Sequence, residues 1–167
     1  GLDGSTALLS TAGVGLINLV FTMVGLSLID RLGRKSLMYI GSIGYILSLA
    51  TVSWAFSSQV GGIIVVSAVF VFIASHAVGQ GAVIWVFIAE IFPNSVRSKG
   101  QSLGSGTHWV FAALIALLMP QVLAAFSASQ VFAFFTFAMF LQLIFVRFMM
   151  PETKGKTLED VSAALSK

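Results

Sequence analysis

Long stretches without charged residues alternate with short charged clusters along this 167-residue chain. Residues 4–29, 36–89 and 100–146 contain no Asp, Glu, Lys or Arg. A helix needs about 20 apolar residues to cross a hydrocarbon core about 30 Å thick, so the first stretch fits one crossing and each longer stretch fits two. Short polar segments at 57–62 and 127–130 divide the longer stretches. The pattern predicts five membrane-spanning helices at 6–29, 37–57, 62–92, 102–126 and 130–150. A tail at 151–167 follows them.

The bulk composition supports the same fold class. Hydrophobic residues make up 57% of the chain and charged residues only 9%, whereas soluble domains carry roughly 25% charged residues. A chain this apolar cannot cover a water-facing surface, so its outer solvent is the lipid bilayer. The net charge of +3 does not form a basic stripe with exposed aromatic residues, so nucleic acid is not expected as a partner. We expect an all-α, polytopic transmembrane bundle.

The distribution of basic residues predicts the orientation of the spans. All nine Lys and Arg residues lie between spans one and two, between spans three and four, or at the C-terminal end: Arg31, Arg34, Lys35, Arg97, Lys99, Arg147, Lys154, Lys156 and Lys167. Loops that remain in the cytoplasm carry this excess of positive charge. The C-terminus is therefore predicted to be cytoplasmic and residue 1 to be outside.

The first predicted span carries a polar face within an otherwise apolar helix. Four residues spaced four, three and four apart share one side of it: Thr11, Gly15, Asn18 and Thr22. Asn18 lies about 18 Å along the helix from Asp30, near the middle of the membrane. Its amide needs partners there, either on a neighbouring helix or in a water-filled cavity. A packing contact and a substrate contact are both consistent with this position.

Spans three and four offer further polar and aromatic side chains: Ser75, His76, Gln80, Trp85, Gln101, Ser105, His108 and Trp109. Trp109 lies about 12 Å inward from Gln101, too deep for an interfacial aromatic belt. An indole suits a sugar, because its N–H donates to hydroxyl groups and its ring stacks on C–H faces. A lone His inside a helix is more commonly a satisfied packing residue, which is the interpretation we give His76. Gly79 and Gly81 would allow the third span to bend.

Two charged clusters lie at the ends that are predicted to be cytoplasmic. The first is the segment 30–35, and the second contains Glu90, Arg97 and Lys99. Glu90 ends an uncharged stretch and would be partly buried, so it requires a cation. Arg34 and Arg97 are the candidates, because a guanidinium fork matches a carboxylate. The charges could serve only as an orientation signal, or as a latch that holds one conformation.

No arrangement of residues favours an enzyme. The chain has no Cys, no phosphate-binding Gly loop with a Lys, no paired acids within a predicted span, and two His without an acid nearby in sequence. We therefore expect no catalytic residue, no metal site and no cofactor.

Three motifs resemble the sugar porter branch of the major facilitator superfamily. Asp30-Arg31-Leu32-Gly33-Arg34-Lys35 is similar to the loop that joins helices eight and nine of that family. Trp85, Glu90, Pro93 and Arg97 have the spacing found at the end of helix ten and in its loop. Pro151-Glu152-Thr153-Lys154-Gly155 resembles the tail that follows helix twelve.

The resemblance implies a twelve-helix carrier of which this chain forms helices eight to twelve. Helix seven and the N-terminal half of the carrier would then be the missing partner, and the membrane would be a plasma or bacterial inner membrane. The family's sugar contacts match Asn18, Trp85 and Trp109, and we add His108 and Gln80 as candidate contacts. The candidate salt-bridge network at the inner end comprises six residues: Asp30, Arg31, Arg34, Glu90, Arg97 and Glu152.

Departures from the family pattern leave the substrate open. The prolines that often precede the helix-ten Trp are absent from Gly81-Ala82-Val83-Ile84, and His108 stands where Asn or Gln is common. A monosaccharide is the expected substrate, carried either alone or together with a proton. A carrier of the same fold for a polyol or an organic acid is one alternative. A sensor or truncated remnant that transports nothing is another.

Overall fold

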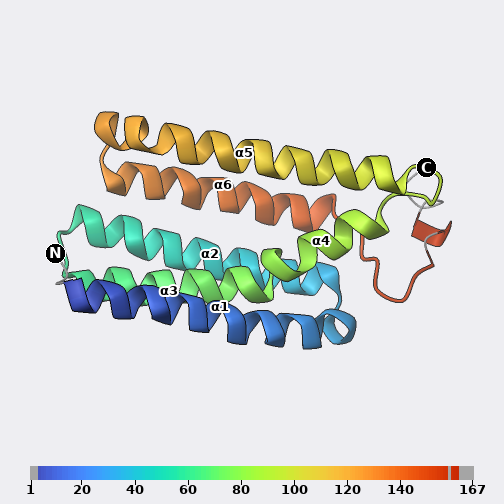
Figure 1. Ribbon diagram of the computed structural model, residues 1–167, viewed down its shortest axis with the longest axis horizontal. Helices are drawn as coiled ribbons and strands as arrows, with labels where there is room; N and C mark the ends of the chain where they lie inside the picture. The colour runs from blue at the N-terminus through green and yellow to red at the C-terminus, as the bar shows by residue number, and fades with distance from the viewer. Residues whose placement is uncertain (1–3, 158, 162–167) are drawn as a thin grey trace.

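The structure, a computed structural model, describes residues 4–157 and 159–161. Its six helices run side by side along the long axis of the molecule (Figure 1). They are α1 (Gly4–Leu32), α2 (Arg34–Ser57), α3 (Gly62–Val78), α4 (Gln80–Glu90), α5 (Arg97–Ala125) and α6 (Ala128–Phe148). Within the described residues, five helical segments are long and apolar enough to cross a membrane, with α3 and α4 together forming the third. The prediction of an all-α bundle with five spans is confirmed.

The helices extend further toward the charged end than the charge-free stretches indicated. α1 continues through Asp30 and Arg31, and α5 begins at Arg97, before the predicted start of its span. Charged side chains near a helix end can reach water along their stems, so the helix need not stop where charge begins. The described part of the tail, 151–157 and 159–161, includes most of the predicted tail segment. Residues 158 and 162–167, with Lys167, lie outside the described residues.

The best-packed core lies toward the charged end of the bundle. Leu37 on α2, Val83 on α4 and Val146 on α6 are each 0% exposed. Other members of this core include Ile29 from α1 and Phe87 from α4. In α5, only Gly100 is buried. The helix α5 is therefore the least enclosed part of the bundle.

The third span is interrupted at Gly79, between α3 and α4. Gly79 has φ −92° and ψ −103°, outside the helical region. A Cβ on Gly79 would lie 2.7 Å from Cα of Gly41 on α2 and 3.0 Å from the Leu37 carbonyl oxygen. Glycine therefore permits both the interruption and the close approach of the two backbones. We predicted bending at Gly79 and Gly81, and the interruption occurs at Gly79.

The polar turn predicted at 127–130 forms the start of α6. The Ser127 hydroxyl accepts a hydrogen bond from the Gln130 backbone N–H at 3.3 Å. The Gln130 side-chain oxygen accepts one from the Ser127 N–H at 2.9 Å. This reciprocal capping box satisfies free N–H groups at the helix start. It starts α6 without any charged residue, and only two residues separate α6 from the end of α5 at Ala125.

Candidate functional site

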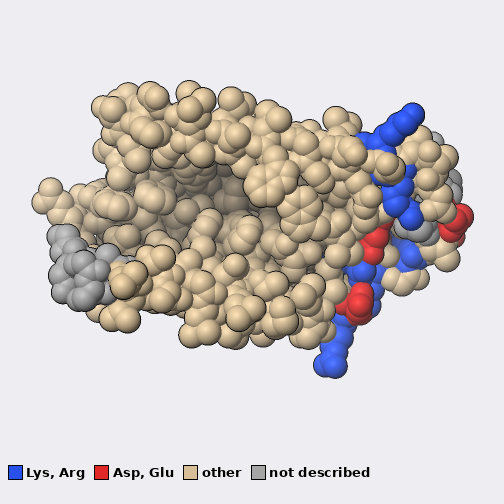
Figure 2. All heavy atoms as spheres, in the orientation of Figure 1, with Lys and Arg blue, Asp and Glu red and all other residues tan. Residues whose placement is uncertain are grey.

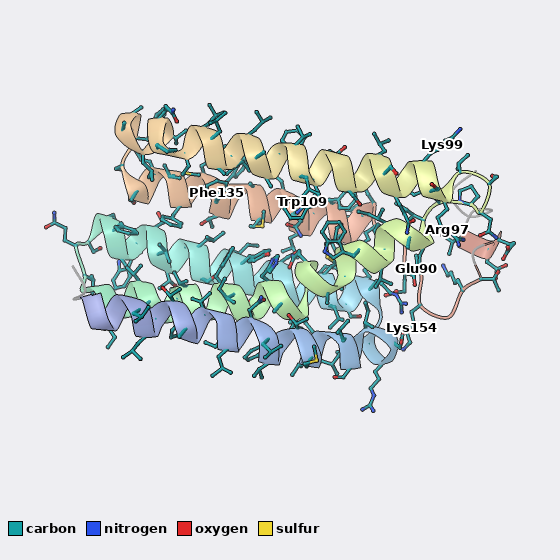
Figure 3. All side chains as sticks on the ribbon, in the orientation of Figure 1. Glu90, Arg97, Lys99, Trp109, Phe135 and Lys154 are labelled. Carbon is teal, nitrogen blue, oxygen red and sulfur yellow. The ribbon has the colours of Figure 1, made fainter. Side chains whose placement is uncertain are left out.

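An aromatic cluster joins α4 to α5. The His108 ring packs edge-on against Trp85, with centroids 5.2 Å apart, and against Trp109, with centroids 5.4 Å apart. Trp85 is 40% exposed and Trp109 64% exposed. Figure 3 shows Trp109 part-way along the bundle, well away from the labelled charged residues. The structure thus brings together three of the five predicted substrate contacts.

The other two predicted contacts lie outside this cluster. Asn18 is exposed on α1, and it has no hydrogen bond to another described residue. Gln80 lies at the start of α4 and donates from Nε2 to the Ser42 hydroxyl on α2 at 3.1 Å. Its Oε1 atom is buried without a hydrogen-bond partner among the described residues. One end of the Gln80 amide therefore holds α4 against α2.

The charged residues gather at one end of the molecule (Figure 2), the end at which α1 meets α2 (Figure 1). Arg34, at the start of α2, is 8% exposed. Its Nη2 lies 2.7 Å from Glu90 Oε1, and its Nε donates to Glu90 Oε2 at 3.0 Å. This two-pronged contact has the geometry that favours Arg over Lys. It ties α2 to the end of α4.

Arg34 also binds the end of α1. Its Nη1 donates to Asp30 Oδ1 at 2.9 Å and to the Ile29 carbonyl oxygen at 3.2 Å. The Thr153 hydroxyl, from the tail, donates to Glu90 Oε2 at 2.6 Å. A single buried guanidinium and its carboxylate partner therefore join α1, α2, α4 and the tail.

Glu152 binds backbone rather than cations. Its Oε1 accepts hydrogen bonds from the N–H groups of Arg34, Thr153 and Lys154, each at 3.0 Å. Its Oε2 accepts one from the Lys35 N–H, also at 3.0 Å. Burial alone would raise the pKa of Glu152, but the hydrogen bonds from Lys154, Lys35, Arg34 and Thr153 outweigh it and lower the pKa. The carboxylate thus anchors the tail to the first turn of α2 and complements its positive dipole end.

Arg97 and Arg31 are placed differently from Arg34. Nε and Nη2 of Arg97 are buried without a hydrogen-bond partner among the described residues, and Arg34 occupies both oxygens of Glu90. Arg31 is exposed, and its carbonyl oxygen accepts a hydrogen bond from Lys154 Nζ at 2.6 Å. Within the described residues, ion pairs join three of the six predicted network residues (Asp30, Arg34 and Glu90), Glu152 lies beside them on backbone N–H groups, and the Arg97 guanidinium has no partner.

Two further residues, not identified as candidates from the sequence, make hydrogen bonds to candidate residues. Thr153 binds Glu90, and the Tyr45 hydroxyl contacts His76 Nδ1. Both contacts join residues more than 30 positions apart, so no local spacing reveals them. Within the described residues, no group of three or more His, Cys, Asp or Glu could hold a metal ion.

The fold and the arrangement of the candidate residues indicate a class of protein. Membrane-spanning helices that hold polar and aromatic side chains part-way along the bundle, with ion pairs at one end, are typical of a membrane transport protein. The sequence model of the family described as "Sugar (and other) transporter" matches residues 1–165. The chain belongs to the sugar porter family of the major facilitator superfamily.

Known relatives align with nearly the whole chain. It is 36% identical over 174 residues to the probable metabolite transport protein CsbC of Bacillus subtilis, covering 100% of this chain and 37% of that one. It is 32% identical to the D-xylose-proton symporter of Escherichia coli K12, covering 98% and 34%. The structure of the proton:xylose symporter XylE bound to 6-bromo-6-deoxy-D-glucose matches with a TM-score of 0.89 and 32% identity, covering 98% of this chain and 36% of that one. The chain spans just over a third of the length of these relatives.

Proposed function

We propose that this chain is the C-terminal part of a carrier that moves a monosaccharide across a cell membrane by alternating access. The observation that carries the proposal is the cluster of Trp85, His108 and Trp109 between α4 and α5. Exposed indoles this far inside a membrane protein offer flat apolar faces and N–H donors, the combination that a sugar ring requires. The relatives that are named for xylose and glucose transport support the substrate class.

We include Asn18, on α1, as a donor and acceptor for sugar hydroxyl groups. Its exposure on α1 leaves the amide free to bind a ligand in the complete carrier. Gln80 supports the site indirectly, because its Oε1 is buried and its Nε2 donates to Ser42, so the side chain positions α4 against α2. The proposed site therefore draws on α1, α4 and α5.

The remainder of the carrier would cover a long apolar groove between α5 and α6. The groove has a volume of about 670 Å³ and is lined by residues of both helices, from Phe111 to Phe135. Each half of a major facilitator protein consists of two inverted repeats of three helices. In that scheme, α1 and α2 pack around α3 and α4, whereas α5 and α6 lack the equivalent third helix. We assign the groove to helix seven, the span that would precede residue 1.

The ion pairs at the inner end would act as a latch. They hold the ends of α1, α2 and α4 together, which we assign to the state that is closed to the cytoplasm and open to the outside. The half-buried Arg97 side chain, which has no acceptor among the described residues, would bind one in the N-terminal half of the carrier once that half is packed against it. The concentration of Lys and Arg at this end supports a cytoplasmic C-terminus, in a plasma or bacterial inner membrane.

Equilibrium binding to the purified complete carrier tests the proposed site. Trp85→Ala, Trp109→Ala and Asn18→Ala should each weaken binding of D-xylose or D-glucose by roughly 1–3 kcal/mol, the range for a lost stacking or hydrogen-bonded contact. Trp54→Ala is the matched control, because Trp54 is 53% exposed near the outer end of α2, away from the cluster. Unchanged affinity in all three variants, with transport retained, would show that these residues only pack the helices.

A second solute class remains a candidate because of His108. An imidazole between two indoles can donate to a hydroxyl group, and when protonated it can also attract a carboxylate. A polyol or an organic acid would therefore suit the same aromatic cluster. Competition against labelled D-glucose by xylitol and by D-gluconate distinguishes these classes from a monosaccharide.

A further inference from the structure

His76 lies in the middle of the third span, on a side of α3 that is open in the described chain. Fourteen residues separate it from each end of the 62–90 segment, about 21 Å of helix in each direction. The His76 side chain is exposed, although its neighbours Ala77 and Val78 are buried. A polar ring at this depth has no lipid head group or bulk water within reach to bind it.

Tyr45, on α2, forms a hydrogen bond with the imidazole of His76. Its hydroxyl lies 2.5 Å from His76 Nδ1. The phenol is only 7% exposed, and its ring packs against Phe72 with centroids 4.7 Å apart. The Tyr45 side chain is therefore fixed between α2 and α3, and His76 is the partner that satisfies its hydroxyl.

The burial of Tyr45 decides which atom donates. The Tyr45 O–H has no other hydrogen-bond acceptor within the described residues, so it must donate to Nδ1 to be satisfied. A neutral imidazole whose Nδ1 accepts carries its proton on Nε2. Tyr45 thereby makes the Nε2–H of His76 a donor of fixed position.

The absence of a side chain at Gly81 leaves space for this ring. A Cβ added to Gly81 would lie 3.0 Å from His76 Nε2 and 3.1 Å from Cδ2, so the imidazole lies over the first turn of α4. Gly81 lies four residues before Trp85 on α4, so the two residues face the same side of that helix, and Trp85 in turn contacts His108 of α5. The Nε2 edge therefore lies on the side of α4 that carries the proposed sugar site.

We propose that His76 is a specificity-determining contact, whose Nε2–H donates to one hydroxyl group of the sugar, and that Tyr45 is its positioning residue. This inference rests on the proposed sugar-binding function and adds a residue to that site. Any other ligand in the pocket would need an acceptor at the same place.

Binding of D-glucose and its monodeoxy analogues to the complete carrier tests the pair. His76→Phe keeps an aromatic ring but removes the donor, and it should raise the Kd for D-glucose about fivefold to tenfold, the worth of one neutral hydrogen bond. It should also abolish the preference of the parent for D-glucose over one particular deoxy analogue. His76→Gln restores an N–H donor and should return the Kd to within about twofold of the parent.

Tyr45→Phe removes a single hydroxyl and serves as the mild variant if His76→Phe does not fold. It should raise the Kd about threefold when His76 is present and leave it unchanged in the His76→Phe background, because it acts only through the imidazole. Tyr39→Phe, on the same helix, is the matched control and should bind as the parent does.

The outcomes separate this inference from the proposed function. A parent carrier that binds no sugar would overturn the sugar-binding function itself. A parent that binds sugar, with Tyr45→Phe and the folded His76 variants showing the same affinity and the same deoxy-sugar preference, would show that the pair only packs α2 against α3. Parallel losses for D-glucose and every deoxy analogue would also contradict a contact to one hydroxyl group.

Discussion

Arg34 combines deep burial with full use of its hydrogen-bonding fork. Its nitrogen atoms bind Glu90, Asp30 and the end of α1, while only 8% of the residue is exposed. Removing one member of such a pair leaves the other charge buried without compensation, which is more destabilising than the pair itself is stabilising. The consequences of substituting Arg34 and Glu90 are therefore predictable in sign and relative size.

Arg34→Ala should destabilise the complete carrier by roughly 2–4 kcal/mol, and Arg34→Lys by less, because an ammonium cannot bind both oxygens of Glu90. Glu90→Gln should reduce transport turnover while sugar binding is largely retained, since Glu90 pairs with Arg34 and Thr153 and lies more than one helical turn beyond Trp85, the residue of the proposed site nearest to it on α4. The double variant Arg34→Ala with Glu90→Gln should lose less stability than the sum of the single losses. Thermal unfolding in detergent, with uptake assays, provides these measurements.

Arg97 supplies the contrast within the same experiment. It shares no hydrogen bond with Glu90 in the described chain, so the losses from Arg97→Ala and Glu90→Gln should add. The assignment of Arg34 as the partner of Glu90 would be contradicted by either of two results. One is that the stability losses of the Arg34 and Glu90 variants add, and the other is that those of the Arg97 and Glu90 variants do not.

The sequence identified these residues but could not pair them. Glu90 at the end of an uncharged stretch needs a cation, and that requirement left Arg34 and Arg97 as equal candidates. The choice depends on how α2 meets α4, and the contact at Gly41 and Gly79 sets that arrangement. Thr153 and Tyr45 were missed for the same reason, because their partners are distant in the sequence.

At the scale of elements, α2 and the α3–α4 junction depend on small residues where their backbones meet. Gly79→Ala should destabilise the carrier by about 1–3 kcal/mol, because the new Cβ would meet backbone atoms that cannot move aside independently. Gly61→Ala, with no atom within 4 Å of its added Cβ, should change stability by less than about 0.5 kcal/mol. Equal melting temperatures for the two variants would show that Gly79 is not a close-packing position.

The tail is the second element with a testable dependence, in this case on pH. The lowered pKa of Glu152 means that its ionised form stabilises the folded state at pH values above the ordinary value of 4.5. That contribution is lost as the pH falls through the lowered native-state pKa. Glu152→Gln should therefore melt below the parent at pH 6, and the difference should shrink as the pH falls below about 4.5. A difference that does not vary with pH would indicate that the carboxylate has no stabilising charge.

The number of spans could be predicted because charge is so costly inside a membrane that its absence marks each crossing. The interruption at Gly79 needed more than this pattern. The stretch contains glycines at 79 and 81 and no proline, and only the contact with Gly41 selects the first. Hydropathy thus locates a span, whereas packing against its neighbours determines its internal shape.

For the whole molecule, the charged end is predicted to face the cytoplasm. In a cysteine-free complete carrier, Ser58→Cys should react with an impermeant thiol reagent from outside, and Ser98→Cys only after the membrane is opened. Both serines are exposed, whereas Ser129 is half-buried and hydrogen-bonded to Ser53, so Ser58 is the better outer position. Labelling of Ser98→Cys in intact cells would reverse the orientation.

Counterflow through the complete carrier is the most direct test of the proposal that this chain is part of an alternating-access sugar carrier. Proteoliposomes loaded with unlabelled D-xylose or D-glucose are diluted into trace labelled sugar. The label should accumulate transiently inside, above its equilibrium level. Each time the carrier releases unlabelled sugar outside, its binding site faces the external solution and can carry labelled sugar inward. The 167-residue chain alone should give no such overshoot, since it lacks the partner bundle. Binding of sugar by the complete protein without any overshoot would contradict the carrier and favour a sensor.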